Sequence, residues 1–133
     1  MRATTRAELV DVEPEEPFLR VTRCRACGRV AFPPMTIGCD ACGAGEEELA
    51  PVTVRAAGVL HASATVHRHH GEQAVPFTIV EVRLDAGPIV RAMGAPGGGG
   101  VRVGDRVAAR WQVTGADGDG NELVEPVFEK ESP

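Results

Sequence analysis

The residues best suited to chemistry in this chain are its cysteines, which occur as two short pairs. Each pair has the spacing C-x2-C, eleven residues separate the pairs, and a glycine follows each; the cysteines are Cys24, Cys27, Cys39 and Cys42. Two residues between paired cysteines let one tight turn direct both sulfurs to one point, and glycine tolerates the left-handed backbone of such a turn. The spacing therefore predicts a tetrahedral four-thiolate site that holds one structural zinc ion per chain.

A site of this kind has a structural rather than a catalytic role. Four thiolates fill every position on a tetrahedral zinc ion, so no place is left for water or substrate. Iron binds to the same four ligands, and an iron-loaded form is therefore the open alternative for the metal. A thioredoxin-type redox pair needs one C-x-x-C at the start of a helix in a βαβ unit, and neither pair has that context.

The cellular compartment follows from the use of the cysteines. A disulfide framework could use the same four residues, but the segment from Met1 to Arg6 leads into acid-rich sequence without the apolar stretch of a secretory signal. No run of 18 apolar residues is present, so no membrane partner is expected. Thiolates kept for a metal indicate a reducing compartment, and the cytoplasm is the expected location.

One row of polar side chains could line a cleft. His61, Ser63, Thr65 and His67 alternate along a predicted strand and would face the same side of it. A strand of a small barrel needs one solvated or partner-facing side, which explains this row without catalysis. Asp85 and Glu81 are the candidate orienting acids, and the histidines from His67 to His70 are not expected to form a second metal site. We therefore predict no catalytic residue and no enzymatic activity in this chain.

The rest of the chain consists of short β segments separated by turn residues. Residues 1–17 contain two prolines and many acids, and are predicted to be an extended or short helical lead-in. Strands at 18–23 and 29–34 flank the first cysteine pair, so the predicted zinc ribbon spans residues 18–49. Valine-rich, alternating segments follow at 52–55, 58–67, 77–84, 89–93, 106–114 and 123–128.

These segments predict a mainly β protein in which the ribbon precedes a five-stranded OB-fold barrel at residues 50–130. Five short strands in about 80 residues suit a small Greek-key barrel. Gly58 stands where the long first strand would have to bend, which favours this closure over a two-sheet sandwich. The run Gly97 to Gly100 lacks the Lys-Ser/Thr of a phosphate-binding loop and is predicted to be a flexible linker.

Charge and aromatic content bear on the partner. The net charge of -5 argues against a general nucleic-acid binder, because such affinity comes mostly from phosphate neutralisation. Single-stranded nucleic-acid binders usually expose several aromatic residues, whereas Trp111 is the only tryptophan and is predicted to pack in the core or an interface. Arg106 and Arg110 flank it and could meet an acidic partner or a phosphate of coenzyme A.

The motifs occur in an order that is more specific than any one of them. The cysteine pairs enclose Phe32-Pro33-Pro34, and the segments Gly58 to His67, Val75 to Asp85 and Val103 to Val107 follow. Over about residues 18–129, this order resembles the acyl-CoA-associated OB-fold family with an N-terminal rubredoxin-like zinc ribbon, catalogued as domain of unknown function family 35. Unlike many members, this chain has a proline- and acid-rich lead-in instead of an N-terminal helical segment.

The resemblance implies a non-catalytic accessory subunit of a thiolase-type acyl-CoA complex. Such a subunit docks on a thiolase-fold enzyme, which carries the lyase or acyltransferase chemistry, and helps to form the passage for the pantetheine arm of acyl-CoA. The alternative function is a single-stranded nucleic-acid-binding protein with an OB fold and a zinc ribbon. A rubredoxin-like electron carrier is a third and more distant alternative.

Overall fold

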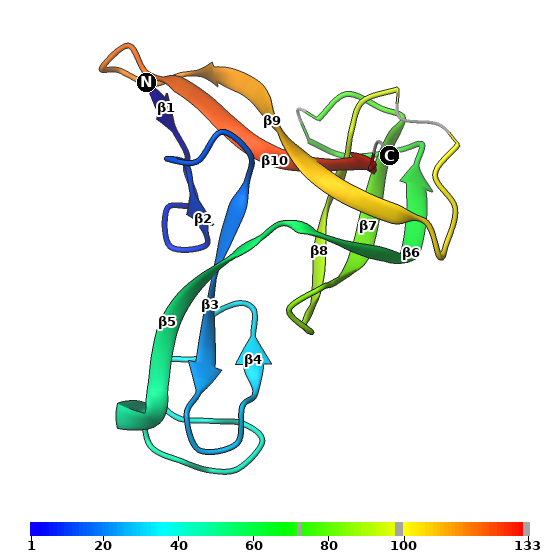
Figure 1. Ribbon diagram of the computed structural model, residues 1–133. Helices are drawn as coiled ribbons and strands as arrows, with labels where there is room; N and C mark the ends of the chain where they lie inside the picture. Colours follow the sequence, from blue (N-terminus) through cyan, green and yellow to red (C-terminus); the bar gives the residue numbers. More distant parts are fainter. Residues whose placement is uncertain (72, 98–99, 132–133) are drawn as a thin grey trace.

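The computed structural model describes residues 1–71, 73–97 and 100–131, and this part of the chain is built almost entirely of strands (Figure 1). One sheet contains β2 (Val10–Asp11), β3 (Phe18–Cys24), β4 (Val30–Ala31) and β5 (Leu49–Arg55), with a 3-10 turn, η1 (Glu46–Glu48), before β5. The second contains β1 (Arg2–Ala3), β6 (Ala57–Val66), β7 (Phe77–Leu84), β8 (Ile89–Gly94), β9 (Arg106–Ala116) and β10 (Glu122–Lys130). No helix in the described residues is long and apolar enough to cross a membrane.

Five strands of the second sheet close into a barrel. β6, β7 and β8 form an antiparallel meander, β8 pairs in parallel with β10, and β10 pairs with β9, which returns to β6. The parallel contact joins Met93 to Val127 and closes the circle. This is the connectivity of an OB-type barrel, so the predicted fold class, a zinc ribbon followed by a five-stranded barrel, is confirmed.

The ribbon sheet is organised around β3. β5 pairs antiparallel with the whole of β3, from Phe18 opposite Arg55 to Cys24 opposite Leu49. β4 pairs only with the C-terminal end of β3. Residues 49–55 therefore lie in the ribbon sheet and not in the barrel. The division of the chain into units at residues 1–17, 18–49 and 50–130 stays a prediction about which segments fold together.

The two sheets share one hydrophobic core. On β7, Val80, Val82 and Leu84 alternate into it, as the valine pattern of that segment requires. The same cluster includes Val10 and Leu19 from β2 and β3. Burial of these side chains fixes the ribbon on the barrel.

The lead-in runs along the barrel and is held there by Trp111. The indole Nε1 donates a hydrogen bond to the carbonyl of Pro14 at 3.2 Å, and the guanidinium of Arg2 lies over the ring, 5.5 Å from its centroid. The ring also packs against the core cluster. The prediction that Trp111 packs rather than serves as an exposed stacking platform is confirmed. Residues 98 and 99 of the predicted glycine linker lie outside the described residues.

Candidate metal centre

The four cysteine side chains meet at one point of the ribbon. All four Sγ atoms lie within 4.8 Å of one another. Two of the separations are 3.7 Å, between Cys24 and Cys42, and 3.6 Å, between Cys27 and Cys39. A tetrahedral zinc ion with Zn–S bonds of about 2.3 Å holds its sulfurs about 3.8 Å apart. The thiols therefore fit a four-thiolate metal ion, and they are the only such group of three or more potential ligands in the described residues.

The two cysteine turns have matching backbone geometry. The N–H of Gly28 donates to the carbonyl of Cys24 at 2.8 Å, and the N–H of Gly43 donates to the carbonyl of Cys39 at 3.0 Å. Both glycines have the positive φ that the sequence predicts, 83° and 77°. β3 ends at Cys24, so the ribbon sheet places the first turn and the loop after β4 returns the second turn opposite it.

The backbone around the thiols also sets their acidity. The amides of Cys42 and Ala41 lower the pKa of the Cys39 thiol to about 7. The amide of Ala44 lowers the pKa of Cys42, but burial and the neighbouring thiols outweigh it and raise that pKa to about 12. A metal must displace the protons that remain on the thiols, so binding releases protons and weakens as the pH falls.

An ion pair joins the two turns outside the thiols. Arg29 Nε and Nη2 donate to the two carboxylate oxygens of Asp40 at 2.9 and 3.2 Å. Hydrogen bonding to Arg29 lowers the pKa of the Asp40 carboxyl. Because both side chains are exposed, this pair orients the turns more than it stabilises them.

The predicted polar row is divided in the structure. The pairing of β6 with β7 shifts register between Leu60 and Ala62, so His61 is the extra residue of a bulge. A bulge reverses the alternation of the strand beyond it, and Ser63 and Thr65 consequently line the same groove as Leu60. His61 and His67 do not line this groove. The expectation of one continuous row was therefore wrong, because it assumed a regular strand.

This groove is a hollow of about 700 Å³ at one end of the barrel. Its lining includes the core residues Val80 and Phe128 and the hydroxyl-bearing residues Ser63, Thr65 and Thr78. None of its described lining residues is titratable. Such a surface can accommodate a neutral, partly apolar chain, and the described part of its lining contains no acid or base.

The candidate orienting acids and the flanking arginines all form ion pairs within this chain. Arg106 forms hydrogen bonds at 2.6 and 2.9 Å with Asp85 and at 3.2 Å with Glu131. Arg91 binds Glu81 at 3.0 Å, and Arg110 binds Glu129 at 2.8 Å. The interpretation that Arg106 and Arg110 meet an external acid or phosphate is not needed, since carboxylates of this chain already neutralise them.

A four-cysteine ribbon packed on a five-stranded barrel defines the class: a mainly β protein with a four-thiolate metal site and an OB-type barrel. Residues 13–48 match the family described as "ChsH2, rubredoxin-like zinc ribbon domain", so the ribbon of this chain is of that type. The chain is also similar to a chain of the solved structure "Ltp2-ChsH2(DUF35) aldolase", with 24% identity, a TM-score of 0.63 and coverage of 84% of each chain. No curated protein matches the chain. The first match confirms the resemblance over the zinc ribbon, and the second shows the same fold over most of the chain.

Proposed function

We propose that this protein is a non-catalytic accessory subunit that docks on a thiolase-fold enzyme of acyl-CoA metabolism. One observation carries the proposal: the fold matches, over 84% of both chains, a chain from an aldolase structure named for two components, Ltp2 and ChsH2. The match of the ribbon to the ChsH2 zinc-ribbon family supports the same assignment. In this view the lyase or acyltransferase chemistry belongs to the partner.

The metal would act as a brace for the docking surface. The ribbon sheet contributes Leu19 to the shared core, so loosening the ribbon would also disturb the barrel. Cys24, Cys27, Cys39 and Cys42 would hold one zinc ion, which supplies folding free energy to a unit too small to have a core of its own.

The groove beside Ser63 and Thr65 is the proposed contribution to the acyl-CoA passage. Its volume of about 700 Å³ falls within the range of small-molecule sites, about 300 to 1,000 Å³. Pantetheine is a flexible, neutral chain of amides and methylenes, and a lining of hydroxyl-bearing and apolar residues suits both parts of it. The absence of titratable residues from the described lining fits a wall of a passage better than a reaction centre.

The test is to mix the zinc-loaded protein with the thiolase-fold enzyme encoded nearest to it and to measure acyl-CoA turnover. We expect no turnover by this chain alone. The mixture of the two proteins should turn over acyl-CoA several-fold faster than the enzyme alone. Ser63→Trp should block the groove and abolish the increase while the complex still forms, and Val113→Ala, outside the groove, serves as the control. Full turnover by the enzyme alone, with no complex, would contradict the proposal. Tight binding of single-stranded DNA or RNA at moderate salt would instead favour the nucleic-acid alternative.

A further inference from the structure

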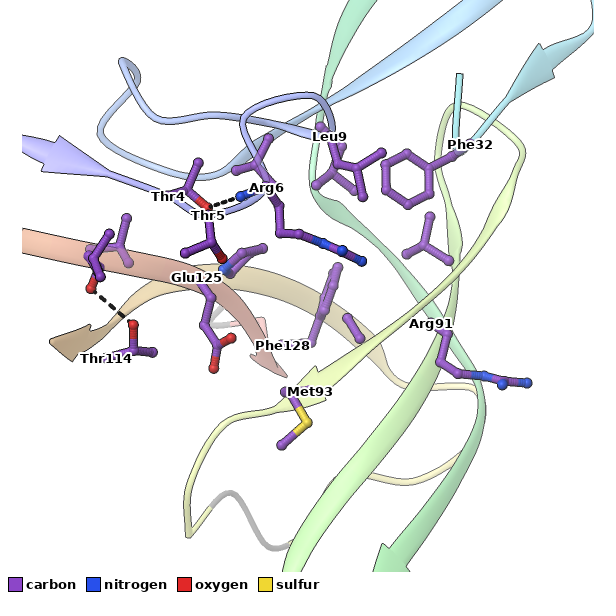
Figure 2. Close-up of a pocket in the computed structure, with 17 residues that line it drawn as sticks. Thr4, Thr5, Arg6, Leu9, Phe32, Arg91, Met93, Thr114, Glu125 and Phe128 are labelled. Atoms are coloured by element: carbon purple, nitrogen blue, oxygen red, sulfur yellow. Dashed lines mark hydrogen bonds between the residues drawn. The ribbon is translucent and has the colours of Figure 1, made fainter. Parts of the chain in front are cut away.

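A second cavity, of about 230 Å³, lies where the lead-in, the ribbon and the barrel meet (Figure 2). Its lining includes Leu9 from the lead-in, Phe32 from the ribbon, Val90 from β8 and Phe128 from β10. Because an apolar cavity of about 150 Å³ admits benzene, this one has room for on the order of nine non-hydrogen atoms. The cavity exists only while the three parts of the chain are held together.

Arg6 brings a positive charge to this apolar space. Figure 2 shows its side chain extending below Leu9 toward the space between Phe32 and Phe128. Its N–H donates to Thr4 Oγ1 at 3.1 Å, and its carbonyl accepts from the N–H groups of Leu9 and Val10 at 2.9 and 3.0 Å. This turn fixes the backbone from which the guanidinium projects.

The other charged residues of the lining do not neutralise Arg6. Within the described residues, no carboxylate forms an ion pair with its guanidinium. Arg91 is bound to Glu81 at 3.0 Å and points away from the cavity (Figure 2). The side chain of Glu125 also points away from Arg6 (Figure 2). Arg6, whose side chain is exposed, is thus the cationic group of the lining that is left to meet a ligand.

We propose that this cavity binds a small monocarboxylic acid with a compact apolar body of about eight carbon atoms. The guanidinium of Arg6 holds the carboxylate, and the apolar body lies against Leu9, Phe32 and Phe128. Since the walls come from the lead-in, the ribbon and the barrel, the bound acid also holds these parts together. The site borders the groove beside Ser63, because Met93 and Phe128 line both, but Ser63 lines only the groove and the site needs no partner enzyme.

The test is a titration of the zinc-loaded full chain with 3-phenylpropanoate, followed by NMR of the methyl groups of Leu9 and Val90. The alcohol 3-phenylpropanol and the amine 3-phenylpropylamine serve as matched uncharged and cationic probes. We expect ring-current shifts at both residues and binding of the acid at least about tenfold tighter than that of the amine. Arg6→Gln should weaken acid binding about tenfold, whereas Arg91→Gln should leave it unchanged.

Ala92→Leu supplies a second test, because Ala92 lines the cavity and a larger side chain would fill it. With its folding verified by the amide spectrum, this variant should bind none of the three probes. The proposal would be overturned by the absence of shifts with every probe, by equal affinity for acid and amine, or by equal losses in the two arginine variants. Undiminished binding to Ala92→Leu would place the probe elsewhere and would also overturn it. Ser63→Trp, which blocks the groove, should not affect this titration.

Discussion

At the scale of single residues, a tetrahedral metal centre needs all four thiols, so the loss of one should remove the ion. We predict that Cys39→Ser lowers zinc affinity by more than about 100-fold, because even the loss of a group that only supports a ligand costs about 10- to 100-fold. Competition with a chromophoric chelator measures this. Asp40→Asn, next to Cys39 in the same turn, should keep stoichiometric zinc, and a similar loss in both variants would argue against a direct role for the thiol.

A second prediction at this scale concerns the ion pair of Asp85. Hydrogen bonding to Arg106 lowers the pKa of the Asp85 carboxyl below its ordinary value of about 3.9. A carboxyl whose pKa is lowered in the folded state stabilises that state above its unfolded pKa, and the contribution disappears as the pH falls through the folded pKa. In an NMR titration, Arg106→Gln should shift the pKa of Asp85 back upward. An unchanged pKa in that variant would mean that Arg106 is not the cause.

The sequence predicted that the four cysteines meet at one point, because each cysteine pair and its glycine act locally. The partners of Arg106 and Arg110 could not be read in the same way. Asp85 and Glu131 lie 21 and 25 residues away from Arg106, and only the closed barrel brings them together. The sequence suggested an external anion for these arginines because it showed their charge but not their neighbours.

At the scale of elements, the close approach of β6 to the backbone of β7 depends on Gly58. A Cβ at this position would overlap the carbonyl oxygen of Arg83 on β7, which is a backbone atom that cannot turn aside. We predict that Gly58→Ala destabilises the protein by about 1 to 3 kcal/mol, as overpacking typically does. Thermal unfolding measures the change. Gly115→Ala in β9, where a Cβ meets nothing within 4 Å, should be close to neutral.

The strands of the barrel were largely predictable, since alternating valines mark them and glycine-rich turns separate them. Two features of the elements were not. β5 belongs to the ribbon sheet, where its last residue, Arg55, lies opposite Phe18. The local pattern could not show this pairing, because the two residues are far apart in the chain. The bulge at His61 has no signal in the local pattern, and it decides that Ser63 rather than His61 faces the groove.

At the scale of the whole molecule, the lead-in contacts both the ribbon and the barrel, and the sequence alone did not predict these contacts. Trp111→Phe keeps the packing of the ring but removes the hydrogen bond to Pro14. We predict a loss of about 1 kcal/mol in unfolding free energy and faster hydrogen exchange in residues 9–14. Unchanged exchange in that segment would show that the indole N–H does not hold the lead-in.

The central claim is that a metal-braced ribbon and barrel form a docking surface for an enzyme. The most direct measurement is analytical ultracentrifugation of this protein with the thiolase-fold enzyme used in the turnover test, before and after the metal is removed by a chelator and then restored. We expect one complex with the zinc-loaded protein, none after chelation, and recovery when zinc is added back. A metal-free protein, or Cys39→Ser, that forms the complex as tightly as the zinc-loaded chain would contradict the account.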